Sequence, residues 1–361
     1  MRYIWIFIWI FILNLFYKRV APEDSIYYDS FDEFGYRRMI PLFLAISAFI
    51  PILIIAVFGE ARNDVPFYTM AFKAMPSTIE DAKVYIRAND EGKLFAAFSI
   101  LIKMLFGYDK TIYRFSIFLF HAIPVMYLFR KYSQDYFLSL YLFCAAAMPI
   151  AWMMNGLRQF MAAGIILLAT PLLENKKYIK LFIVILIASL IHQTAIVMIP
   201  LLLIADGKAF NKRTLFFILC AVVVFWAFLH NRGLFDTVLV TAGYDPSNYA
   251  ADTGSNLYRL LVSCVPVILA VYCRREILES GDFIINLSVN MSIVTALLYL
   301  VAMVTSGITI GRLPGYTATY SFVLYPYLFK MGLREPSSSL IKFGCIVFYF
   351  LFWYLQYGQA Y

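Results

Sequence analysis

Five basic side chains that could do chemistry lie at or near the ends of apolar runs in this 361-residue sequence: Arg62, Arg158, His192, Arg259 and Arg312. An ionised side chain at hydrocarbon depth costs roughly 2.5 to 3.5 kcal/mol, so such residues usually line a cavity and have a function there. Arginine can hold a phosphate through paired hydrogen bonds, and histidine titrates near neutral pH, as a general base should. These five residues are therefore the first candidates for a functional site.

The segment Asn155-Gly156-Leu157-Arg158-Gln159 lies between two apolar runs. Gly156 permits a tight backbone turn, and the three polar residues offer several hydrogen-bond donors to phosphate or sugar oxygens. We therefore interpret Asn155 and Gln159 as substrate-binding residues beside Arg158. The alternative is an arginine that extends to the lipid head groups.

His192 is followed by Gln193 and Thr194, and it is the only one of three histidines in a polar cluster within a long apolar stretch. Its titration near neutrality suits a general base, with Gln193 as a substrate contact. The alternative is a packed, hydrogen-bonding histidine. His121 and His230 are interpreted as structural.

Three further polar segments complete the candidate set. Gly311-Arg312-Leu313-Pro314-Gly315-Tyr316 breaks an apolar helix pair, and broken backbone at membrane depth is tolerated mainly where it lines a cavity. Arg259 follows the polar stretch 253–258. Arg62 and Asp64 open a polar loop, with Tyr68 one helical turn later, and a local Arg62–Asp64 pair is the alternative there.

The elements that must position these residues are apolar helices. Hydrophobic residues make up 62% of the chain, charged residues 14%, and the mean hydropathy is +0.76, which is typical of a polytopic membrane protein. Several runs approach or exceed the roughly 20 residues of a membrane-spanning helix, and lipid-facing backbone must be helical. We expect an all-α fold of about twelve transmembrane or re-entrant helices in a single domain, residues 1–361. The clearest runs are Met39 to Phe58, Tyr136 to Met154, Thr214 to Leu229, Leu257 to Cys273 and Phe283 to Thr305.

The formal net charge of +8 is spread over short loops, which argues against nucleic acid as a partner and favours a topology signal. Placing the basic loops in the cytoplasm makes 59–110, the 155–159 turn, the His192 junction, 230–256 and 306–316 face outward. This solution requires Leu94 to Phe106 to be re-entrant or interfacial. It also requires Tyr178 to Ala205 to turn near His192. The first apolar run, Ile4 to Phe16, is expected to be a retained helix.

Some chemistry has no sequence support. The chain has no Walker-type phosphate loop, no zinc-binding His-Glu pattern and no Gly-x-Ser-x-Gly elbow. The five cysteines lie in apolar segments without metal-ligand or redox spacing. An outward-facing site has no access to cytoplasmic nucleotide sugars, so a sugar donor would already be attached to a lipid. No cofactor and no metal are expected.

At its polar segments the chain resembles the EpsG family of Wzy-type polysaccharide polymerases. The resemblance covers about residues 60 to 330 and rests on the order and spacing of its motifs. They are Arg62-Asn63-Asp64 with Tyr68, Asn155 to Gln159 followed by Ala162, Asn175-Lys176-Lys177, Ile191 to Ala195, and Thr305-Ser306-Gly307 to Gly311-Arg312-Leu313-Pro314-Gly315-Tyr316. The family often has Ser where Thr194 stands, a departure that keeps the hydroxyl.

The resemblance implies a multi-pass enzyme of the bacterial inner membrane, with a GT-C-like glycosyltransferase architecture and its active site facing the periplasm or exterior. Such an enzyme polymerises repeat units of O-antigen, capsule or exopolysaccharide that are carried on undecaprenyl diphosphate. Its partners are this lipid-linked oligosaccharide, membrane lipid, a flippase and a chain-length regulator.

In the implied reaction, the growing glycan leaves its undecaprenyl diphosphate and joins a hydroxyl of an incoming lipid-linked unit. Arg158 and Arg312, with Arg259 and Arg62 as weaker candidates, could hold the diphosphate as it gathers charge, and no metal would then be needed. His192 could accept the proton of the attacking hydroxyl. Asp64, Tyr68 and Tyr316 complete the predicted substrate contacts.

Two alternatives stay open. A metal-dependent glycosyltransferase could use a polyprenyl-phosphate sugar, with Glu60 or Asp64 as metal ligand or base. A lipid-linked oligosaccharide transporter would also place basic residues in a cavity, although the matching broken helices usual in transporters are not seen in the sequence.

Overall fold

The computed structural model divides into two compact units, which are described separately. Unit 1 comprises Met1–Ile199 with Trp353–Tyr361, and unit 2 comprises Pro200–Phe352. The single-domain organisation stays a prediction. The residues that the structure describes are 3–20, 28–32, 35–88, 92–231, 233–241, 245–249, 252 and 254–358.

Long apolar helices dominate the described residues, as expected. Five are long and apolar enough to cross a membrane, and two bent helix pairs raise the number to seven if each pair is one span. Together with the composition, this makes the protein a polytopic, mainly α-helical membrane protein. The five are Lys110–Tyr132, Leu157–Glu174, Lys212–His230, Phe283–Ala302 and Ser337–Gln356; the bent pairs are Tyr136–Ala145 with Met148–Met154 and Leu257–Tyr272 with Arg274–Ser280.

One short hairpin departs from the expected all-helical fold. Strands β1 (Tyr28–Asp32) and β2 (Gly35–Arg38) pair antiparallel between α1 and α2. This segment is polar and aromatic, and it lies outside the apolar runs on which the helix prediction rested.

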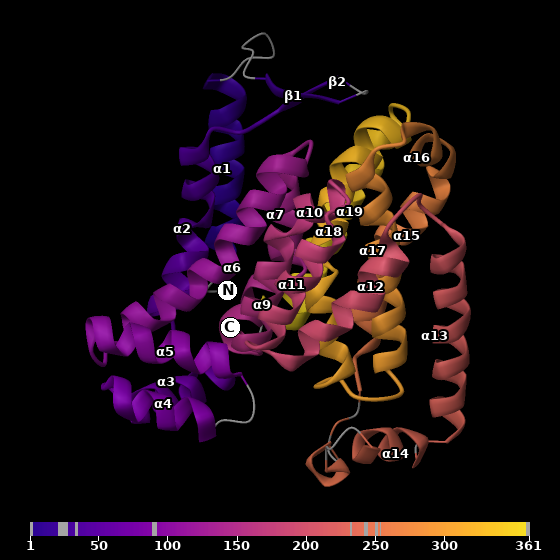
Figure 1. Cartoon of the computed structure of the whole chain (residues 1–361). Coiled ribbons are helices and arrows are strands. Elements are labelled where there is room, and N and C mark those ends of the chain that lie inside the picture. Colours follow the sequence, from indigo (N-terminus) through magenta and orange to yellow (C-terminus); the bar gives the residue numbers. More distant parts are fainter. Residues whose placement is uncertain are drawn as a thin grey trace. The chain divides into compact units, whose positions relative to one another are not determined.

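In unit 1, α6 (Lys110–Tyr132) packs against α2 (Leu42–Phe58) and α9 (Leu157–Leu168). Helices α3, α4 and α5 lie at a large angle to α1 and α2 (Figure 1). α5 (Lys93–Phe106) is too short to count as a span, in keeping with the expected re-entrant or interfacial segment. The other elements are α1 (Ile4–Val20), α3 (Asp64–Ala74), α4 (Ile79–Ala88), α7 (Tyr136–Ala145), α8 (Met148–Met154), α10 (Thr170–Glu174), α11 (Tyr178–Ser189), η1 (Gln193–Val197) and η5 (Tyr354–Gly358).

In unit 2, α17 (Phe283–Ala302) is the central helix, buried along most of its length. Two of its asparagines fix the loop before α13: Asn286 Oδ1 accepts from the Ala209 backbone N–H, and Asn290 Nδ2 donates to the Ala205 carbonyl. The other elements are α12 (Met198–Ala205), which begins at the boundary between the units, α13 (Lys212–His230), α14 (Gly233–Thr241), η2 (Pro246–Tyr249), α15 (Leu257–Tyr272), α16 (Arg274–Ser280), η3 (Ile310–Tyr316), α18 (Thr319–Tyr327), η4 (Leu328–Gly332) and α19 (Ser337–Trp353).

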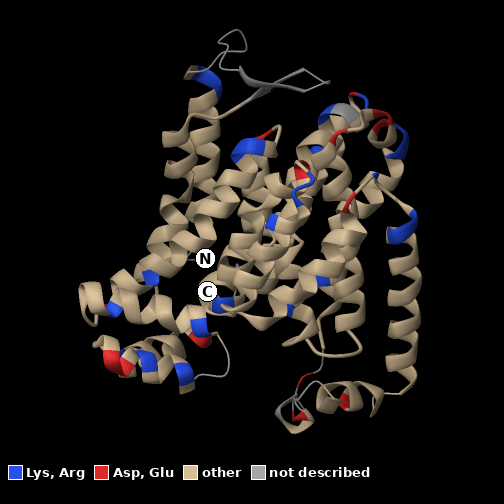
Figure 2. Cartoon of the chain, in the orientation of Figure 1, with Lys and Arg blue, Asp and Glu red and all other residues tan. Residues whose placement is uncertain are grey.

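The basic loops and the polar turns of unit 1 lie at opposite ends of its helices. Lys131 at the end of α6 pairs with Glu174 at the end of α10, with Nζ and Oε2 3.2 Å apart, and Arg130 donates to the Ile40 carbonyl before α2. α9 begins at the other end, at the Arg158 turn, and leads through α10 to Glu174. Charged side chains gather at helix ends and on α3 to α5, whereas the middle of α13 carries none (Figure 2).

Candidate active site

The Arg158 turn is built as the sequence predicts. α8 ends at Met154, Gly156 takes a left-handed conformation with φ of 64°, and α9 begins at Leu157. The Gly156 backbone N–H donates to Asp64 Oδ2 at 2.8 Å. Asp64 is the first residue of α3, so its carboxylate ties that helix to the start of α9. The predicted contact of Asp64 with substrate stays a prediction.

The Arg158 side chain is half-buried against α3 and α5. Its Nε donates to Tyr68 Oη at 3.2 Å. Asp64 and Tyr68 are four residues apart on α3, and residues at this spacing share one helix face. A methyl group on Gly92, just before α5, would stand 2.8 Å from Arg158 Nη1 and 3.2 Å from the Ile191 carbonyl oxygen. Arg158 thus lies where α3, α5, α9 and the end of α11 meet.

The helix break at His192 is confirmed. α11 ends at Ser189, and the 3₁₀ segment η1 begins at Gln193. The Leu94 backbone N–H of α5 donates to the Leu190 carbonyl at 3.0 Å. Because Gly92 also packs on the Ile191 carbonyl, this break lies at the same end of unit 1 as Arg158. The His192 side chain is half-buried, and its role as a base stays a prediction.

The remaining predicted residues of unit 1 differ in exposure. Arg62 pairs with Glu60 at 2.6 Å between Nη2 and Oε2, with 35% and 63% of the two side chains exposed. Arg62 thus has an exposed ion-pair partner in Glu60, the metal ligand or base of one alternative. Asn155 is half-buried and Gln193 exposed, whereas Gln159 is only 2% exposed and faces the protein interior.

In unit 2, the Asp252 carboxylate holds the turn that leads to Arg312. It accepts hydrogen bonds from Ser306 Oγ at 2.5 Å and from the backbone N–H groups of Gly254, Gly307 and Ile308 at 3.0 Å each. Burial by itself would raise the pKa of Asp252, but these four hydrogen bonds to the charged form outweigh it and hold the pKa below its ordinary value. Asp252 therefore holds the segment before α15 against the turn at Ser306 to Ile308.

The segment before α15 also packs on the end of α17, where the Ser255 backbone N–H donates to the Ala302 carbonyl. A methyl group on Gly254, whose φ is +85°, would stand 2.6 Å from the Met303 carbonyl oxygen and 2.7 Å from that of Ala302. Arg312, in η3, is half-buried, as is Arg259 in the first turn of α15. Tyr316 is buried, with 2% exposed. The joining of these residues with Arg158 in one cavity stays a prediction.

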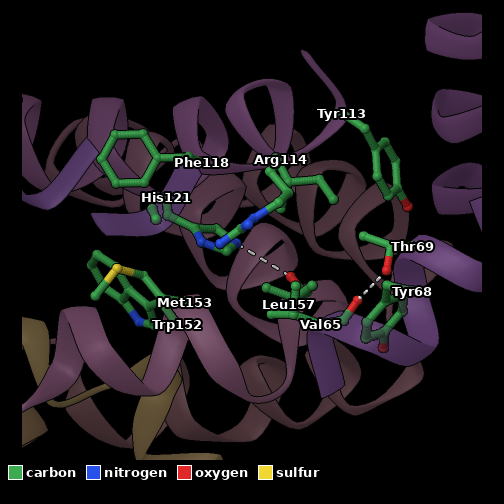
Figure 3. A pocket seen from close by; sticks show the side chains of 12 residues that line it. Val65, Tyr68, Thr69, Tyr113, Arg114, Phe118, His121, Trp152, Met153 and Leu157 are labelled. Carbon is green, nitrogen blue, oxygen red and sulfur yellow. Dashed lines mark hydrogen bonds between the residues drawn. The ribbon is translucent and has the colours of Figure 1, made fainter. Parts of the chain in front are cut away.

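Unit 1 also holds a small pocket, lined mostly by α3, α6, α8 and α9, that sequence reasoning missed. Figure 3 shows Arg114, His121 and Trp152 among the side chains that surround it. His121 Nε2 donates to the Leu157 carbonyl at 3.2 Å, in keeping with a structural histidine. Arg114 was overlooked because one arginine in the first turns of an apolar helix resembles an ordinary interfacial residue, and Trp152 carries no sequence signal of its own.

The fold and these polar helix breaks define a polytopic helical membrane protein with a candidate site at one end of unit 1. The EpsG family model matches residues 41–360, nearly the whole chain, and the protein therefore belongs to the EpsG family. This family is similar to the Wzy-type polymerases and indicates a polysaccharide polymerase-like function. Comparison with curated proteins and with solved structures finds no match.

Proposed function

We propose that this protein is a polysaccharide polymerase that transfers a growing glycan from undecaprenyl diphosphate to a hydroxyl of an incoming lipid-linked repeat unit. The observation that carries the proposal is the placement of Arg158 in an EpsG-family chain. Its half-buried guanidinium is held by Tyr68, on a turn that Asp64 ties to α3. A fixed cation at the end of a membrane helix suits a departing diphosphate.

The reaction needs one bond to form and one to break. The acceptor hydroxyl oxygen attacks the anomeric carbon of the reducing-end sugar, and the bond from that carbon to the diphosphate oxygen breaks, with the electron pair leaving on the diphosphate. Arg158 stabilises this developing charge. His192 takes the hydroxyl proton, and undecaprenyl diphosphate is released.

The contacts around Gly92 support a joint role for Arg158 and His192. The Arg158 guanidinium and the Ile191 carbonyl pack against the same glycine, which brings the His192 backbone to the neighbourhood of the arginine. In this proposal Arg312 and Arg259 of unit 2 also bind substrate diphosphate. The enzyme has a GT-C-like architecture, lies in the bacterial inner membrane, and acts on its outer face.

The test is the identity of the lipid-linked intermediate that accumulates in cells. Arg158→Ala and His192→Ala, each produced at the wild-type level, should accumulate single-repeat lipid-linked units and lose long polymer. Arg275→Ala is a control, because Arg275 pairs with Glu279 on an exposed surface. Polymer of normal length from both site variants would refute the proposed roles.

A further inference from the structure

Lys103 is one of two charged residues in α5, and the residues on both sides of it are apolar. The other, Lys93, is the first residue of the helix. A lysine among apolar side chains commonly extends its charge to water or to the lipid head groups. Lys103 instead turns to protein backbone: its Nζ donates to the Lys73 carbonyl at 2.7 Å and also to the Met75 carbonyl.

Both acceptors of Lys103 belong to the end of α3. The last residue of this helix is Ala74, and Met75 follows as its cap. The last carbonyls of an α-helix have no donor within the helix, and they carry the negative end of its dipole. A lysine ammonium at this point satisfies such carbonyls and is favoured by the dipole. Lys103 therefore fastens the end of α3 to α5.

α3 and α5 are also joined at two earlier levels. The ring of Tyr68 in α3 meets the ring of Phe95 in α5 edge-on, with centroids 5.6 Å apart. One turn later in α3, Phe72 stacks on Tyr113 of α6, with centroids 4.0 Å apart. The Tyr113 hydroxyl lies 3.0 Å from the Ser99 hydroxyl of α5. The Phe72 level thus reaches α5 through Tyr113.

The three levels form one stripe along each helix. Phe95, Ser99 and Lys103 follow at intervals of four residues, so they share one face of α5. Their contacts come in the same order along α3, and the two helices lie side by side (Figure 1). Lys103 makes the last contact. A slip of one helical turn, about 5.4 Å, would break all three levels, so Lys103 helps to set the place of α3 along α5.

We propose that Lys103 is a positioning residue: by holding the end of α3 it fixes the place of Tyr68 and, through Tyr68, that of Arg158. α3 meets the Arg158 turn at two points, because Asp64 accepts from the Gly156 N–H and Tyr68 accepts from Arg158 Nε. The hold on α3 is inferred from these contacts alone. Its effect on glycan elongation rests on the proposed function, in which Arg158 stabilises the departing diphosphate.

Hydrogen–deuterium exchange of the full-length protein in detergent tests the hold without reference to any reaction. Lys103→Met suits an apolar helix and removes only the donor. It should raise the exchange rates of the last turn of α3 and of the Gly156 N–H about tenfold, because both depend on the place of α3. Lys103→Arg keeps a donor and should stay within about threefold of the wild type.

Lys73→Met is the matched control for the loss of charge. It removes an exposed positive charge at the same end of α3 and leaves the Lys73 carbonyl in place. Its exchange rates should lie within about twofold of the wild-type values. If Lys103→Arg exchanges as fast as Lys103→Met, or if Lys103→Met exchanges like the wild type, Lys103 does not hold α3 and the proposal is wrong.

The kinetics of elongation separate positioning from general stabilisation. Per folded protein, Lys103→Met should lower kcat about tenfold and leave KM within about twofold, because a displaced guanidinium loses contacts of the transition state. A purely stabilising residue would change the amount of folded protein and not kcat. In an Arg158→Ala background, Lys103→Met should lower kcat no further, although α3 should still exchange faster.

These measurements keep the proposal and the proposed function apart. An unchanged kcat in Lys103→Met, or an undiminished further loss in the Arg158→Ala background, would overturn the positioning role while leaving the polymerase intact. A wild-type protein that does not elongate glycan would refute the proposed function. Faster exchange of both α3 and Gly156 in Lys103→Met would still support the hold of Lys103 on the Arg158 turn.

Discussion

Replacing Gly92 with alanine tests whether the packing around Arg158 positions it for catalysis. Gly92 is left-handed, with φ of 69° and ψ of 34°, and an L-residue pays about 1 to 2 kcal/mol there. The added methyl group would stand 2.8 Å from Arg158 Nη1 and 3.2 Å from the Ile191 carbonyl oxygen. The side chain can move away more easily than the backbone, so the guanidinium shifts and its bond to Tyr68 weakens.

The expected loss of activity follows from that shift. A hydrogen bond is worth about 1 kcal/mol, and a misplacement of about 1 Å at a reacting centre can lower the rate 100-fold. We expect Gly92→Ala to elongate glycan about tenfold to 100-fold more slowly. The measurement is chain elongation from lipid-linked repeat units by equal amounts of folded protein, alongside the thermal midpoint.

Gly281→Ala is the matched control, because Gly281 is also left-handed, with φ of 62°, and a methyl group there would meet none of the described residues within 4 Å. It should lose similar stability but at most about threefold in rate. An equal loss of activity in the two variants would mean that backbone strain, and not the position of Arg158, causes the loss. In an Arg158→Ala background, Gly92→Ala should reduce the rate no further.

Three other outcomes are expected. Tyr68→Phe, which removes the acceptor of Arg158 Nε, should slow elongation about fivefold, and the same change should have little effect in Arg158→Ala. Asp252→Asn should lower the thermal midpoint at pH 7. The pKa of Asp252 is lowered in the folded protein. The charged carboxylate therefore stabilises the fold above the ordinary aspartate pKa of about 4, and this stabilisation is lost as the pH falls through the folded-state pKa. The thermal midpoint of Asp252→Asn should depend less on pH in that range than the midpoint of the wild type. Gly254→Ala should reduce folded protein sharply, since two backbone carbonyls would crowd its methyl group.

These three outcomes have their own controls. Asp236→Asn removes an exposed carboxylate of α14 and should keep the wild-type pH dependence of the midpoint. If the thermal midpoint of Asp252→Asn equals the wild-type value at pH 7, Asp252 does not stabilise the contact between the segment before α15 and the Ser306 turn. For Gly254→Ala the comparison is again Gly281→Ala, and equal yields of folded protein would show that the close carbonyls can give way. If the effects of Tyr68→Phe and Arg158→Ala on the elongation rate are fully additive, the two residues act independently.

The sequence predicts the helix breaks well, because each depends on local chemistry. Gly156 supplies the left-handed residue that a tight turn needs, and the polar run after Ile191 interrupts an apolar stretch. Hydropathy likewise predicts α13 and α17 as spans within a residue or two of their starts. The hairpin β1–β2 was missed because it carries no apolar run.

The contacts that organise the site depend on distant partners, which a local pattern cannot supply. In the sequence, Asp252 is one acidic residue in a polar loop. Its partners, Ser306 Oγ and the backbone N–H groups of Gly307 and Ile308, lie more than 50 positions later and reach it only in the folded protein. Arg114 and Trp152 are 38 positions apart, and only the packing of α6 on α8 and α9 brings them to one pocket. The alternative interpretation paired Arg62 with Asp64, whereas the structure pairs Arg62 with Glu60, two positions before it.

The most direct test of the central claim uses the purified protein in proteoliposomes, supplied with one chemically defined lipid-linked repeat unit. A polymerase that uses Arg158 should produce a ladder of lengthened lipid-linked glycans and release an equivalent amount of undecaprenyl diphosphate, and folded Arg158→Ala should lose both products. Transfer of the units across the bilayer without lengthening would contradict this expectation, as would a normal ladder from Arg158→Ala.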